Sequence, residues 1–205
     1  MSGSRFFDEV YADGADAGGA AFYDRWAHGY DAAVSGEGYA TPSRIAAALI
    51  EAGADPSGPL LDYGCGTGLS GEALRAAGFE TIDGWDVSRG MLEEASEKGV
   101  YRSLDLIDPE DTDFSPVSDY ASVAAIGVIG AGAAPASVFD EIMKALPSGG
   151  LFAFSFNDHT LEDPSYEARV LDWIDCGAAE LLFKAHGDHL PGLDLGAIVY
   201  VLRKR

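Results

Sequence analysis

Short apolar runs and helical repeats alternate along most of the chain. Runs typical of strands lie at residues 59–62, 81–86, 100–106, 120–129 and 150–156. Between them, apolar spacing and terminal signals predict helices at 71–77, 88–98 and 136–146, and another helix at 41–53 precedes the first strand. This repeated order predicts an α/β fold with a doubly wound, mostly parallel sheet and helices on both faces.

The carboxyl-terminal part of the chain changes this rhythm. After a helix expected at 163–176, residues 179–186 and 197–203 are typical of two strands joined by a loop of about ten residues. A parallel crossover needs about a dozen residues or more and usually a helix. The last two strands are therefore expected to form an antiparallel hairpin that closes a seven-stranded sheet.

Length and composition favour one domain. A chain of 205 residues with 47% apolar residues can form a single core. Residues 1–21, rich in Ala, Gly and Asp, are expected to be loosely ordered. We expect the domain to span residues 22–205, with an N-terminal helical lid at 22–52.

Charge and cysteine content limit the binding partners and the cellular compartment that we expect for this protein. The 34 acidic against 13 basic residues give a net charge of −21, which disfavours nucleic acids and anionic membranes and leaves a small molecule as the expected partner. The first ten residues carry charges that argue against a signal peptide, and residues 120–136 are too interrupted by glycine to span a bilayer. Two cysteines, Cys65 and Cys176, fit a reducing compartment, and no spacing typical of a metal site occurs. A cytoplasmic protein without a metal is expected.

A glycine-rich turn follows the first strand. Gly66, Gly68 and Gly71 match the G-x-G-x-x-G of nicotinamide dinucleotide sites, so an oxidoreductase has to be considered. A second pattern, D-x-G-x-G-x-G, runs from Asp62 to Gly68. A carboxylate at this strand end suits a ligand that carries an ammonium group and does nothing for a pyrophosphate. The acid therefore favours S-adenosylmethionine (SAM).

Residues 62–68 resemble motif I of the class I SAM-dependent methyltransferases. Residues 86–95 are similar to the D-x-S-x-x-M-L-x-x-A of the UbiE-like group that methylates small molecules. This resemblance implies a Rossmann-like methyltransferase fold in which Asp86 holds the ribose hydroxyls. It also implies that Val87 and Met91 cover the adenine, and that the acid of Leu104-Asp105-Leu106 accepts from the adenine amino group.

Further segments resemble the Williams–Beuren region 27-like methyltransferases. They are residues 22–31, 127–132, and 188–192 followed by 199–203. The resemblance implies methyl transfer to a small-molecule acceptor that it does not identify. Gly130 and Ala131 stand where many UbiE-like enzymes carry a His pair, so no catalytic residue is assigned. The candidate cofactor contacts are Asp62, Gly64, Cys65, Gly66, Thr67, Gly68, Asp86, Val87, Met91, Leu104, Asp105, Leu106, Ala125, Ile126, Tyr30 and Arg44.

Several candidates have a second interpretation. Arg44 is either a solvated arginine or the partner of the ligand's carboxylate, and Met91 is either a core residue or part of the adenine site. Tyr23, Trp26 and Tyr30 recur at helical spacing, so they form either a core stripe or a lid that lines the acceptor pocket.

The acceptor side of the site is the least defined part of the sequence. Asn157 and His159 follow the fifth strand and are further candidates for the acceptor pocket, although a histidine in such a position is more often a plain surface-loop residue. A SAM-binding protein without catalytic activity is a third alternative, because methyl transfer needs no obligatory signature. The sequence gives no oligomeric state.

Overall fold

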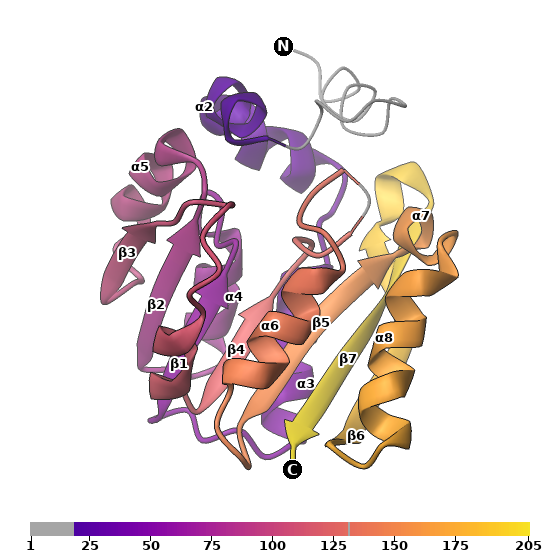
Figure 1. Cartoon of the computed structure of the whole chain (residues 1–205). Coiled ribbons are helices and arrows are strands. Elements are labelled where there is room, and N and C mark those ends of the chain that lie inside the picture. Colours follow the sequence, from indigo (N-terminus) through magenta and orange to yellow (C-terminus); the bar gives the residue numbers. More distant parts are fainter. Residues whose placement is uncertain (1–18, 131) are drawn as a thin grey trace.

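The predicted sheet is present in the computed structural model, which describes residues 19–130 and 132–205. Seven strands lie side by side (Figure 1) in the order β3 (Ser103–Leu106), β2 (Thr81–Asp86), β1 (Pro59–Tyr63), β4 (Ser122–Ala125), β5 (Leu151–Asn157), β7 (Leu195–Lys204) and β6 (Ala179–Leu190). Strands β1 to β5 pair in parallel, whereas β7 is antiparallel to both β5 and β6. The doubly wound sheet with an antiparallel closing hairpin is therefore confirmed.

Helices cover both faces of the sheet. One face carries α3 (Thr41–Glu51), α4 (Leu69–Ala76) and α5 (Arg89–Lys98), and the other carries η1 (Ser115–Asp119), α6 (Ser137–Ala145) and α8 (Pro164–Asp175). Neighbouring strand residues point to opposite layers: Leu60 packs with α3 and α4, and Leu61 packs with α6. Both side chains are fully buried. The alternation places a core on each side of the sheet.

Local signals set the ends of the helices beside the sheet's carboxyl edge. The Ser88 hydroxyl accepts from the Met91 backbone N–H at 3.1 Å and so caps α5, which ends at Gly99 with a positive φ of 62°. Asp163 caps α8 in the same way by accepting from the Ser165 N–H at 2.9 Å.

Two predicted boundaries are wrong. The fourth strand, expected at 120–129, ends at Ala125 because the backbone turns away at Gly127, where φ is 69°. The loop of about ten residues expected between the last strands is also wrong, since β6 continues to Leu190, which pairs with Leu195. The 3-10 turn η2 (Pro191–Leu193) joins them, and an irregularity between Asp188 and Leu190 lets the pairing continue. The sequence analysis also missed the short α7 (Asp158–Leu161).

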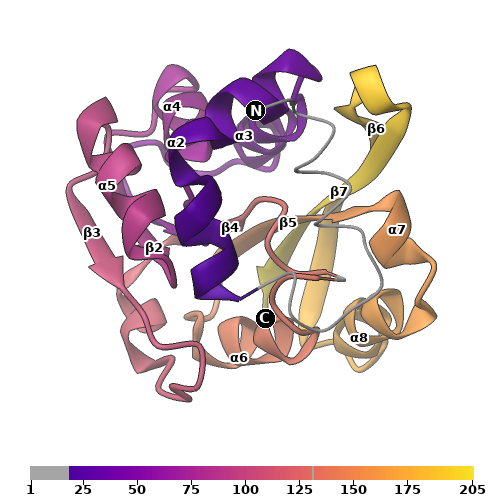
Figure 2. The ribbon, with the colours of Figure 1, turned by 90° about the horizontal axis from the view of Figure 1, so that it is seen from above.

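The helix α2 (Ala20–Gly36) lies over the carboxyl edge of the sheet, beside α5 (Figure 2). Residues 1–18 of the segment expected to be loosely ordered lie outside the described residues. Among the residues that the structure describes, no helix is both long enough and apolar enough to cross a membrane.

Candidate functional site

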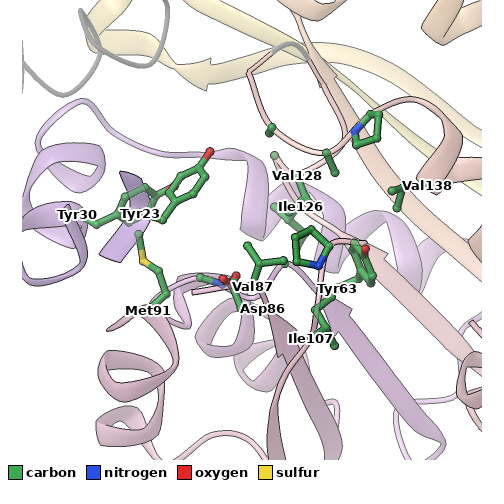
Figure 3. A pocket seen from close by; sticks show the side chains of 17 residues that line it. Tyr23, Tyr30, Tyr63, Asp86, Val87, Met91, Ile107, Ile126, Val128 and Val138 are labelled. Carbon is green, nitrogen blue, oxygen red and sulfur yellow. The ribbon is translucent and has the colours of Figure 1, made fainter. Parts of the chain in front are cut away.

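A cavity of about 190 Å³ opens at the carboxyl edge of the sheet (Figure 3). Its wall comes from α2, the glycine turn after β1, the segments after β2, β3 and β4, and the start of α6. Asp86 is the only charged residue among the described residues that line it. The cavity therefore lies where doubly wound folds bind ligands, at the ends of their parallel strands.

The glycine turn brings bare backbone to this cavity. Gly64, Gly66 and Gly68 have φ values of 71°, 53° and 92°, which side chains rarely adopt. A Cβ atom on Gly64 would collide with the side chain of Val128, which lies directly over it. The turn thus needs glycine for its conformation and, at Gly64, for the close approach of the loop after β4.

Asp86 ends β2 and is held rigidly at the cavity. Its side-chain oxygens accept from the backbone N–H groups of Gly66 and Ser88, at 2.8 and 2.9 Å. The residue is only 8% exposed, and this burial raises the pKa of its carboxyl above the usual value, against the lowering effect of those hydrogen bonds. The backbone N–H of Val87 also stabilises this carboxylate, whose oxygens lie at the cavity where a ligand can donate to them.

Asp62, at the end of β1, lies behind the glycine turn and does not line the cavity. Its Oδ2 accepts from the hydroxyls of Ser70 at 2.6 Å and Tyr101 at 2.8 Å. Its Oδ1 is buried without a hydrogen-bond partner among the described residues. Complete burial raises the pKa of Asp62 to about 6, so this carboxyl changes protonation near neutral pH.

Several predicted contacts gather at the cavity and others do not. Those that line it are Tyr30, Gly64, Gly66, Asp86, Val87, Met91 and Ile126, together with Tyr23 from the acceptor set. Cys65 is buried beneath the turn, where burial raises the pKa of its thiol, and Thr67 donates its hydroxyl to Asp31. Ala125 is fully buried in the core.

The predicted residues of β3 lie apart from the cavity. Leu106 is 48% exposed, and Asp105 accepts from the Ser103 hydroxyl at 3.2 Å. The cavity instead reaches Ile107 and Pro109, the first residues beyond this strand. The contacts of Asp105 therefore give no support to its predicted role with the adenine amino group.

Arg44 is placed away from the cavity lining. Its guanidinium donates to the backbone carbonyls of Asp188 at 2.8 Å, Ala197 at 3.1 Å and Ala185 at 2.9 Å. These bonds join α3 to the hairpin of β6 and β7. The arginine is thus used within the protein, and its contacts do not support a role with the ligand's carboxylate.

The three candidate residues Tyr23, Trp26 and Tyr30 of α2 do not all support the same interpretation. Tyr23 and Tyr30 line the cavity, whereas Trp26 is buried at 8% exposure against Phe22 and the apolar residues that flank η2. The remaining acceptor candidates have structural contacts: Asn157 caps α7 by accepting from the Thr160 N–H at 2.9 Å, and exposed His159 lies 3.7 Å from Glu162.

Two aspartates on α2 were missed by sequence reasoning. Asp24 accepts from the Ser88 hydroxyl at 2.6 Å and the Gly90 N–H at 2.9 Å, and these bonds lower the pKa of its carboxyl. Asp31 accepts from the Thr67 hydroxyl and forms an ion pair with Lys98 at 2.7 Å. A signal was present, because the pair Tyr-Asp at 23–24 recurs at 30–31, two helical turns later.

Comparison with known proteins agrees with this geometry. Residues 38–198 match the family described as "Methyltransferase domain". Human methyltransferase-like protein 27 is 37% identical over 131 residues, which cover 62% of this chain and 54% of the human protein. The chain thus matches about half the length of that relative.

Solved structures share the fold at low sequence identity. The [4+2]-cyclase SpnF has a TM-score of 0.66 and 16% identity, with 90% of this chain and 94% of SpnF covered. Magnesium protoporphyrin IX methyltransferase from Synechocystis PCC 6803, solved with bound SAM, has a TM-score of 0.63 and 17% identity, with 100% of this chain and 92% of that chain covered.

Proposed function

The chain belongs to the methyltransferase domain family, in the class I fold that uses SAM, and we propose that it transfers a methyl group from SAM to a small-molecule acceptor bound beneath α2. The single observation that carries this proposal is the Asp86 carboxylate. It is held by backbone N–H groups, among them those of Gly66 in the glycine turn and Ser88, and it lines the cavity. Two adjacent ribose hydroxyls can donate to its two oxygens.

The rest of the lining fits the parts of the cofactor. Val87, Met91 and Ile107 supply apolar surface for the adenine next to Asp86, and the backbone at Gly64 and Gly66 is open to the methionine part. The buried, unpartnered Oδ1 of Asp62 supports the predicted interaction with the ligand's ammonium group, in this case through a bridging water, because Asp62 does not reach the cavity.

Methyl transfer requires the protein mainly to position the two reactants. SAM supplies a methyl group that is bound to a positively charged sulfur. A nucleophilic acceptor attacks the carbon of this methyl group directly. The protein's residues have to hold the acceptor about 3 Å from that carbon and keep water away. Tyr23 and Tyr30 place aromatic rings at the cavity, where such rings stabilise a nearby cation. We assign no general base, because the carboxylate of Asp86 is assigned to the ribose.

We propose further that α2 is a cover that closes over the bound cofactor. Asp24 and Asp31 hold it against residues that flank the site: Ser88 follows Asp86 closely, and Thr67 belongs to the glycine turn. These contacts link closure of α2 to the conformation of the cofactor loops. The adjoining helix α3 buries Ile45 and Leu49 in the core, so the cover is limited to residues 20–36.

The proposal is tested in two steps. First, calorimetry should detect S-adenosylhomocysteine binding to the wild-type protein and much weaker binding to Asp86→Ala. Second, incubation with SAM and a panel of small thiols, amines, phenols and carboxylic acids should yield S-adenosylhomocysteine and a methylated product detected by mass spectrometry. Binding without product from any acceptor would favour the catalytically silent alternative, and the fold shared with a [4+2]-cyclase makes this second step necessary.

A further inference from the structure

Tyr63 lines the cavity and carries a hydroxyl group that has no hydrogen-bond partner among the described residues. It is the last residue of β1, and its ring packs near Phe114 and Trp85, with centroids 6.0 and 6.4 Å away. The side chain is only 7% exposed. None of the described residues forms a hydrogen bond with this hydroxyl, and it is not one of the fully buried atoms, so it keeps some exposure to the cavity.

Three other buried or partly buried tyrosines donate through their hydroxyls to carboxylates. The hydroxyl of Tyr101 donates to Asp62 at 2.8 Å, that of Tyr120 donates to Asp83 at 2.9 Å, and that of Tyr200 donates to Glu167. Tyr63 differs from them because it lines the cavity (Figure 3). Its hydroxyl brings a hydrogen-bond donor that no described residue uses to a wall lined largely by apolar side chains. The hydroxyl group therefore points to a partner that enters the cavity.

The position of Tyr63 indicates which part of the ligand it meets. In the pairing of β1 with β2, Tyr63 lies opposite Trp85, the residue before Asp86. Beyond Asp86, Val87 and Ile107 lie on the same part of the cavity wall as Tyr63 (Figure 3), and Pro109 also lines the cavity. These apolar residues next to the ribose site fit a flat base, and Tyr63 adds a polar side chain to the lining.

We propose that the Tyr63 hydroxyl donates a hydrogen bond to a ring nitrogen of the cofactor's adenine and thereby helps to select this base. The inference rests on the proposed function, since it needs SAM in the cavity. Burial raises the pKa of Tyr63 to about 12, so the hydroxyl keeps its proton at neutral pH and can donate. The ring nitrogens N1, N3 and N7 of adenine only accept. The role in base recognition that the sequence pattern gives to Asp105 passes in this account to Tyr63.

The first test compares Tyr63→Phe with the matched control Tyr166→Phe, which removes a hydroxyl outside the cavity lining. Calorimetry should show that Tyr63→Phe binds S-adenosylhomocysteine about five- to tenfold more weakly than wild type, the usual effect of one hydrogen bond. Tyr166→Phe should bind as wild type does. The ligand-free melting temperature of Tyr63→Phe should not fall, because its hydroxyl has no protein partner to lose. Unchanged affinity in Tyr63→Phe would overturn the proposal.

The second test identifies which ring nitrogen of adenine accepts the hydrogen bond. Its measurements on the wild-type protein do not depend on any variant. The 1-deaza, 3-deaza and 7-deaza analogues of S-adenosylhomocysteine each replace one ring nitrogen by a C–H group. Wild type should lose about five- to tenfold in affinity for the one analogue that lacks the accepting nitrogen, and Tyr63→Phe should not distinguish that analogue from the parent compound. Equal wild-type affinity for all three analogues, or the same loss in the variant, would overturn the inference. Failure of wild type to bind S-adenosylhomocysteine would instead contradict the proposed function.

Discussion

The floor and the cover of the cavity are held by different forces. The floor consists of the ends of β1, β2 and β4 with the glycine turn at 64–68, and cores lie on both faces of the sheet beneath it. The cover, α2, buries a smaller apolar cluster that includes Phe22, Trp26 and Val34, and polar contacts such as those of Asp24 and Asp31 also hold it. Polar contacts exchange with water at small cost, whereas a packed core does not. We therefore expect the cover to open while the floor keeps its shape.

The largest expected effect separates the two regions by stability. Phe154 of β5 is fully buried and stacks on Tyr200 with centroids 5.0 Å apart, so Phe154→Ala should lower the free energy of unfolding by about 3–5 kcal/mol. Trp26→Ala should lower the ligand-free value by less than about 1 kcal/mol, because α2 can detach locally. The same variant should lose most of the rise in melting temperature that S-adenosylhomocysteine gives wild type. Urea unfolding and thermal shift measure both, and equal destabilisation by the two variants would make α2 part of the core.

Titration of Asp62 should make the floor less stable as the pH rises. The pKa of this carboxyl is raised from below 4 in the unfolded chain to about 6 in the native protein, so the native state binds the proton more tightly. The stabilisation is fully present below about pH 4 and is lost as the pH rises through 6, by roughly 2–3 kcal/mol at 1.36 kcal/mol per unit.

Asp62→Asn is the matched variant for this titration, because it keeps the shape of the side chain and removes the ionisation. The free energy of unfolding of wild type minus that of the variant should fall between pH 4 and 7, as measured by urea unfolding at each pH. A difference that stays constant or rises would show that Asp62 does not titrate in this range.

Asp86 should have the strongest effect on binding among the acids predicted from the sequence. Asp86→Ala should weaken S-adenosylhomocysteine binding by about 2 kcal/mol, or roughly thirtyfold, because the hydrogen bonds of the ribose are made to a carboxylate. Asp105→Ala is the control, since Asp105 does not line the cavity and should bind within about twofold of wild type. Calorimetry measures the affinity of both variants. A larger loss of affinity in Asp105→Ala than in Asp86→Ala would show that Asp105 contacts the cofactor after all.

The smallest expected effect concerns the polar contacts of the cover. Asp31→Asn removes the charge that pairs with Lys98, and Asp31 is partly exposed, so the cover should lose about 0.5–1 kcal/mol. Protease cleavage within residues 20–36 of the ligand-free protein should then become about two- to fivefold faster. His28→Ala removes the pair with Glu94 at the outer surface, where His28 is 91% exposed, and should change the rate little. Equal rates in Asp31→Asn and wild type would mean that this contact does not hold the cover.

Features encoded within one segment could be predicted from the sequence. The glycine turn, Asp86 and the end of α5 at Gly99 depend on residues close together in the chain, and they lie where the pattern places them. The partner of Arg44 could not be predicted, because the three carbonyls that it binds belong to a hairpin more than a hundred residues away. The sequence could not predict that the Tyr63 hydroxyl has no partner among the described residues, because this depends on which distant residues the fold places beside it.

Hydrogen exchange with and without S-adenosylhomocysteine tests most directly whether one cavity binds the cofactor on a preformed floor and beneath a mobile cover. In the free protein, amides of β1, β2 and β4 should exchange slowly and those of residues 20–36 quickly. Ligand should slow exchange in residues 20–36 and in the turn at 64–68 together. Exchange in residues 20–36 that is already slow and does not change with ligand would contradict the cover, and absence of any protection at residues 64–68 would contradict the site itself.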